Sequence, residues 1–101
     1  MMAPLEIAAE REGDRGWIFD LRRRGGSAIE SKIVLAWVDY DWWSPDGRDP
    51  PAAVALAVAE VFDASLSTAN ATLPAHFDAS TVRKRVAGAD SLIVAQLAQS
   101  P

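Results

Sequence analysis

The chain has 101 residues, of which 50% are apolar and 24% are charged, with a formal net charge of −4 and no cysteine. This size and composition predict a single globular domain, residues 1–101, rather than a disordered chain. The lack of cysteine excludes disulfides and thiolate metal sites and fits a reducing, cytoplasmic compartment. The negative charge disfavours generic nucleic-acid binding.

The first residues predict no secretion signal, because Glu6 is already acidic and no apolar run follows a basic stretch. The longest unbroken apolar run, from Ala52 to Ala59, is far shorter than the roughly 20 residues of a membrane span. Arginine outnumbers lysine eight to two and alanine is abundant, which we interpret as the coding bias of a GC-rich bacterial genome. We therefore expect a water-soluble bacterial protein.

Alternating apolar residues predict three strands in the first half of the chain, over residues 4–11, 16–23 and 31–43. Glycine-rich turns separate them, which favours an antiparallel meander. Residues 33–38 are apolar at every position, a pattern typical of a strand covered on both faces. After this run the alternation returns, so a strand would place Asp39 and Asp41 on one face and Tyr40 and Trp42 on the other.

The second half of the chain predicts helices over residues 50–64, 79–87 and 90–98. Pro50 suits the first position of a helix, and Asp49, Asp78 and Asp90 are suitable N-caps. In the first helix the apolar residues share one face, and they are Val54, Val58, Val61, Phe62 and Leu66. Gly88 is expected to end the second helix. The predicted fold is α+β, a three-stranded meander with two or three helices packed on one face.

This fold leaves the second face of the third strand without cover from the chain itself. The residues expected there are the candidate interface, namely Val34, Val38, Tyr40, Trp42 and Trp43. An exposed apolar patch on a small domain usually meets a partner, most often a second copy of the same chain. The leading hypothesis is therefore a small non-enzymatic protein–protein interaction domain that forms homodimers.

The segment from Leu73 to Arg85 has the pattern Leu-Pro-x-x-Phe-Asp-x-Ser-x-Val-x-Arg. With the strand, turn and Pro-started helix before it, this segment resembles a family of short uncharacterised bacterial proteins over roughly residues 31–90. The resemblance implies an α+β fold and carries no known activity or site residues. The sequence departs from the family pattern after the second helix, where Val86-Ala87-Gly88 replaces the expected Phe-Pro.

An alternative hypothesis is a divalent-cation or small-ligand site in the segment Asp39–Asp49. Four aspartates in this short segment offer the oxygen ligands that calcium prefers. The EF-hand spacing fails, however, because Trp43 and Ser44 stand where an oxygen ligand and a glycine belong. Each aspartate also has a local explanation in a strand, a turn or a helix cap, so we expect no metal and no cofactor.

No catalytic residues are predicted. His76 is the only histidine, and no cysteine or second histidine can complete a triad or a zinc site with it. Asp39 and Asp41 resemble an acid–base couple in their spacing, but no feature of the sequence buries one of them to raise its pKa.

A further alternative is a small nucleic-acid-associated regulator. Two basic triplets, Arg22–Arg24 and Arg83–Arg85, could converge beside Trp42 or Trp43, where single-stranded bases would stack. Neither triplet forms a stripe by itself. Arginine is also common at a hairpin end and in the last turn of a helix, where it complements the helix dipole.

Overall fold

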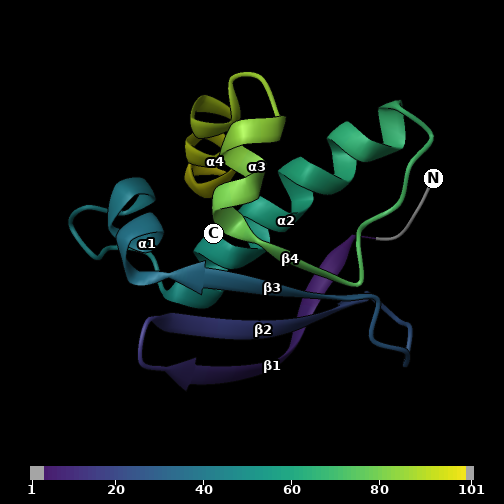
Figure 1. Cartoon of the computed structure of the whole chain (residues 1–101), viewed down its shortest axis with the longest axis horizontal. Helices are drawn as coiled ribbons and strands as arrows, with labels where there is room; N and C mark the ends of the chain where they lie inside the picture. The colour runs from purple at the N-terminus through teal and green to yellow at the C-terminus, as the bar shows by residue number, and fades with distance from the viewer. Residues whose placement is uncertain (1–3, 100–101) are drawn as a thin grey trace.

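The N-terminal strands form the antiparallel meander that the alternation predicts (Figure 1). In the computed structural model, which describes residues 4–99, β1 (Leu5–Gly13), β2 (Gly16–Arg23) and β3 (Ser31–Ala36) lie side by side in chain order. Both pairings are antiparallel, with a bulge in β1 between Ile7 and Ala9. The predicted α+β class is confirmed, whereas residues 1–3 and 100–101 of the predicted domain lie outside the described part.

The sheet has a fourth strand that the sequence analysis does not predict. This strand, β4 (His76–Asp78), pairs in parallel with β3 and places Phe77 opposite Ile33. The Ser31 hydroxyl donates to the Pro74 carbonyl at the start of this pairing. A three-residue strand is too short to show a period of two, so only its pairing with β3 reveals it.

The predicted third strand is wrong beyond Ala36. There the chain turns into helix α1 (Trp37–Trp43), whose first N–H donates to the Arg15 carbonyl over 2.8 Å. The acids and aromatics alternate only over residues 39–42, which is too short to distinguish a helical period from a strand period. Burial decides between them, because Tyr40 and Trp43 both enter the core, and in a strand these two residues would lie on opposite faces.

Three further helices follow, each beginning within one residue of its predicted start; the first runs four residues beyond its predicted end and the second ends two residues before it. They are α2 (Pro51–Thr68), α3 (Ala79–Arg85) and α4 (Ala89–Ala98). Asp78 caps α3 as predicted, accepting the Ser80 N–H over 2.9 Å. The other two predicted caps are wrong: Pro50 occupies the cap position of α2 and Gly88 that of α4.

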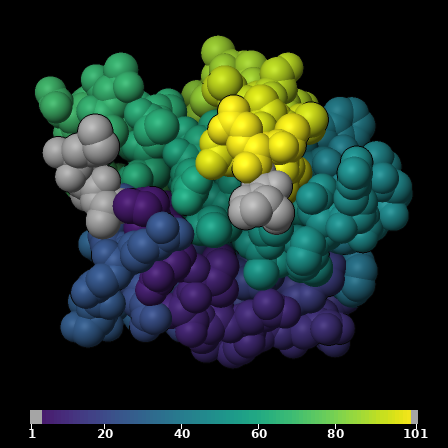
Figure 2. Space-filling model, turned by 180° about the vertical axis from the view of Figure 1, so that it is seen from behind, coloured from purple at the N-terminus to yellow at the C-terminus, as the bar shows by residue number. Residues whose placement is uncertain are grey.

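The helices gather on one side of the sheet, with α1 standing at the end of β3 (Figure 1). The core lies between the sheet and α2, where alternate strand residues such as Phe19 and Ile33 face Val58 and Phe62. From behind, α4 lies against the middle of the chain, above the N-terminal strands (Figure 2). By length and composition α2 could cross a membrane, and in this structure its buried residues, which include Val58 and Phe62, belong to the core.

The other face of the sheet carries charged side chains rather than a second helical layer. Arg22 pairs with Glu6 over 2.6 Å, and Asp20 pairs with Arg11 and Lys32 over 3.5 and 3.4 Å. Val34 is half-buried on this face. The open face is therefore mostly polar, and the large apolar residues that are exposed lie outside the strands.

Candidate functional site

Helix α1 has two faces of opposite character, because residues three and four apart share a side of a helix. Asp39, Tyr40 and Trp43 point inward and are at most 8% exposed. The outer face is formed by Trp37, Val38, Asp41 and Trp42, which we call the α1 patch. Its apolar members are 45%, 73% and 59% exposed for Trp37, Val38 and Trp42 respectively.

Hydrogen bonds from the inner face fix α1 on the rest of the molecule. The Trp43 indole donates to the Asp90 carboxylate of α4 over 2.9 Å. The Tyr40 hydroxyl donates to the Asp49 carbonyl in the loop that follows α1. These bonds hold a helix of only seven residues in one orientation, so the exposure of its outer face does not result from fraying.

An aromatic stack anchors the beginning of the helix. The rings of Trp17 and Trp37 have centroids 4.3 Å apart, and those of Trp17 and Tyr40 lie edge to face at 5.3 Å. Trp17 is buried in β2, so these ring contacts fix the position of the α1 patch relative to the sheet. Aromatic pairs at these distances stabilise by about 0.5–1.5 kcal/mol beyond their buried area.

Arg83 of α3 lies over the other end of the α1 patch. Its guanidinium carbon is 4.6 Å from the centroid of the Trp42 ring. The same group approaches Asp39 of α1 over 3.4 Å and Asp90 of α4 over 3.3 Å. One arginine therefore joins three helices and supports the Trp42 ring, a role that its sequence position in a last helical turn does not reveal.

Asp39 is the one aspartate of α1 that is buried. Removal from water raises the pKa of its carboxyl above the ordinary value of 3.8, and the charge of Asp78 acts in the same direction. Arg83, through its charge and its hydrogen bond, lowers this pKa. The prediction that Asp39 lies beside Asp41 on a solvated strand face is wrong, because the helix turns the two carboxylates to opposite sides.

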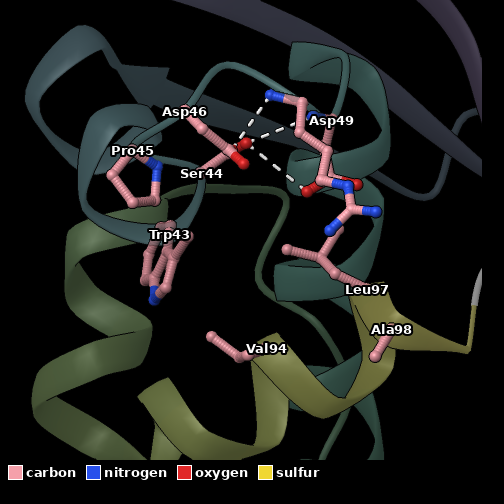
Figure 3. Close-up of a pocket in the computed structure, with 9 residues that line it drawn as sticks. Trp43, Ser44, Pro45, Asp46, Asp49, Val94, Leu97 and Ala98 are labelled. Atoms are coloured by element: carbon pink, nitrogen blue, oxygen red, sulfur yellow. Dashed lines mark hydrogen bonds between the residues drawn. The ribbon is translucent and has the colours of Figure 1, made fainter.

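The loop after α1 borders an open hollow of about 680 Å³ against α4 (Figure 3). Trp43 and Val94 belong to its apolar wall, and Asp46 and Asp49 lie at the loop side. Both carboxylates form hydrogen bonds within the loop. Asp46 accepts the Arg48 N–H over 3.2 Å, and Asp49 accepts the Ser44 hydroxyl at 3.4 Å.

No metal-ligand cluster is present among residues 4–99, where no three acidic or histidine side chains converge. Asp39 faces Arg83 inside the molecule, and His76 lies exposed on β4, so neither joins the aspartates of the loop. The described part of the chain therefore offers no set of ligands for a cation in the segment Asp39–Asp49.

Three residues of the two basic triplets, Arg22, Arg23 and Arg83, are paired with acids of the same chain. Arg23 makes a two-pronged hydrogen bond to Asp63 of α2 over 2.7 and 2.8 Å, and Arg22 is paired with Glu6. In the second triplet, Arg83 binds two aspartates and Arg85 lies 5.7 Å from the Phe62 ring. Charges that are paired internally offer little to a phosphate backbone, so this arrangement does not favour the nucleic-acid alternative.

The five predicted interface residues do not form one surface. Val38 and Trp42 are exposed on the outer face of α1, whereas Tyr40 and Trp43 belong to the core and Val34 lies on the open face of the sheet. Trp37 and Asp41, the other members of the α1 patch, were not among the predicted interface residues. The available signal was the spacing of four residues from Trp37 to Asp41 and from Val38 to Trp42, which places each pair on one side of a helix.

Comparison of the chain with family models, with curated proteins and with solved structures yields no match. The resemblance to a family of short bacterial proteins therefore stays a prediction. The α1 patch is the feature of the molecule that bears most directly on function.

Proposed function

We propose that this protein is a small, non-enzymatic interaction module that binds another polypeptide through the α1 patch. The observation that carries the proposal is the exposure of Val38 and Trp42, side by side on a helix whose inner face is firmly held. Isolated exposed apolar residues are ordinary, but a contiguous group containing tryptophan is typical of docking surfaces.

The rigidity of the patch supports the same function. Arg83 lies over the Trp42 ring, and Trp17 packs against Trp37 with the rings tilted by 46°, so both exposed indoles have restricted conformations before a partner binds. A side chain that is already ordered loses less conformational entropy on binding. The patch therefore suits binding without a large rearrangement.

The contacts of the buried carboxyl and the position of the histidine support the proposal that the protein is not an enzyme. The buried carboxyl of Asp39 is occupied by Arg83, and the single histidine lies exposed on β4, away from that carboxyl. An acid–base mechanism needs such groups within hydrogen-bond reach of one another or of a substrate. The bacterial cytosol is the compartment we propose, since a chain without cysteine suits a reducing environment.

Site-specific photo-cross-linking tests this function. A benzophenone amino acid replaces Val38 in the full chain, and a matched variant carries it at Val94, which is 51% exposed on α4. After irradiation in expressing cells, we expect a protein adduct from position 38, identified by mass spectrometry, and a much weaker one from position 94. Equal yields at the two positions, or no adduct at position 38, would contradict the proposal.

A further inference from the structure

We infer that the partner of the α1 patch is a second copy of this chain, related to the first by a two-fold axis that runs along α1. This inference rests on the proposed function and adds the identity of the partner. It is drawn from the way in which charges flank the apolar part of the patch.

The charges of opposite sign lie on opposite flanks of the helix. At 100° per residue, the outer face of α1 presents Trp37, Asp41, Val38 and Trp42 in that order around the axis. Beyond Trp42 lies Arg83, and the next residue of α3 is the exposed Lys84. The apolar centre, Val38 and Trp42, therefore has an acid on one side and cations on the other.

Two-fold symmetry then decides which charges meet. If the axis crossed α1 at a right angle, each flank of the helix would face the same flank of the second copy. The two Asp41 carboxylates would then repel each other. If the axis runs along α1, the acidic flank of one copy faces the basic flank of the other. Asp41 then lies opposite Lys84, and the same contact occurs twice because an isologous interface repeats every pair.

Lys84 is the better partner for Asp41 than Arg83. Arg83 already binds Asp39 and Asp90, whereas the Lys84 side chain is exposed at the surface of α3. The Asp41 side chain is also exposed. Both charges are thus accessible to a second copy without breaking a contact within the first.

The size of the patch predicts a weak dimer. One tryptophan buries about 150–250 Å², so a patch of this composition covers less than the roughly 800 Å² per partner of a standard stable interface. The dimer should therefore exchange with monomer at micromolar concentrations and weaken as salt screens the flanking charges.

Charge exchange across the interface is a direct test. We expect the wild-type protein to show a reversible monomer–dimer equilibrium in sedimentation velocity. Asp41→Lys and Lys84→Glu should each weaken it about tenfold or more, because each creates two like-charge contacts. An equimolar mixture of the two variants should recover dimers, since each contact then joins opposite charges.

A charge-matched control is Glu10→Lys, which makes the same change of net charge at an exposed position of β1 and should dimerise like the wild type. A mixture that stays monomeric, or a wild-type protein that is monomeric at every concentration, would overturn the inference. The proposed function would survive that result if position 38 still cross-linked to a different polypeptide, and it would fail if position 38 gave no adduct.

Discussion

At the scale of single residues, Arg83 is the charged side chain that connects α1 to both α3 and α4. It contacts Trp42, Asp39 and Asp90, which belong to two different helices. Its planar guanidinium can stack on an indole and donate hydrogen bonds at the same time, which a lysine ammonium cannot do. The position of the α1 patch therefore depends on one arginine.

Asp39 gives the protein a stability that depends on pH. Burial and Asp78 raise the pKa of its carboxyl, so the folded state holds this proton more tightly than the unfolded chain does. Its contribution is fully present below the unfolded pKa of 3.8 and is lost as the pH rises through the raised folded pKa.

Asp39→Asn removes this titration and provides the measurement. We expect the free energy of unfolding of the wild type, minus that of the variant, to decrease as the pH rises from acidic values toward neutrality. Urea denaturation at several pH values measures this difference, and Asp41→Asn, which removes an exposed carboxylate of the same helix, is the control. A difference that increases with pH would show that the ion pair with Arg83 outweighs desolvation.

The aspartates show what residue patterns could and could not predict. Asp78 caps its helix as expected, because the signal for a cap is local. Asp90 instead accepts the Trp43 indole proton, and Asp49 contributes a carbonyl to Tyr40. Both of these roles depend on residues brought together by the tertiary fold, which no local pattern contains.

At the scale of elements, two features were not predictable from the sequence, the short strand β4 and the junction between β3 and α1. The meander, the apolar face of α2 and the approximate helix positions were predictable, since each depends on periodicity over many residues. The four residues 39–42, which alternate between acids and aromatics, do not distinguish a strand from a helix. The contacts of Tyr40 and Trp43 with distant parts of the chain resolve the ambiguity.

Gly16 is required where β2 begins. Its φ is +151°, and a Cβ there would lie 2.1 Å from the Leu35 carbonyl oxygen, which belongs to the backbone of β3. We expect Gly16→Ala to destabilise the protein by about 3 kcal/mol, since backbone strain and overpacking each cost roughly 1–3 kcal/mol.

Gly13→Ala is the matched control for this variant. Gly13 pairs with Gly16 across the same hairpin, and an added Cβ would meet only the Gly16 carbonyl oxygen at 3.9 Å. Thermal and urea unfolding of both variants test the difference. Equal loss of stability in the two variants would show that the crowding at Gly16 is relieved by movement of the strands.

At the scale of the whole molecule, association and folding are thermodynamically linked. A dimer that forms only from folded chains stabilises them by mass action, so the melting temperature should rise with protein concentration. For a domain of this size each kcal/mol corresponds to about 4–8 °C. We expect a rise of a few degrees over a hundredfold concentration range for the wild type.

Asp41→Lys should abolish most of this rise while leaving the melting temperature at low concentration nearly unchanged, because Asp41 is exposed in the single chain. Differential scanning calorimetry at several concentrations provides the comparison. A wild-type melting temperature that does not change with concentration would argue against self-association.

The order in which the chain is synthesised has a consequence for α1. Its inner face is covered by partners far downstream, since Trp43 binds Asp90 and Asp39 pairs with Arg83. These partners are translated well after α1, so in a nascent chain Asp39 and Trp43 lack these contacts until the last helices emerge. Ribosome-bound chains ending before Arg83 should therefore be the forms most dependent on chaperones.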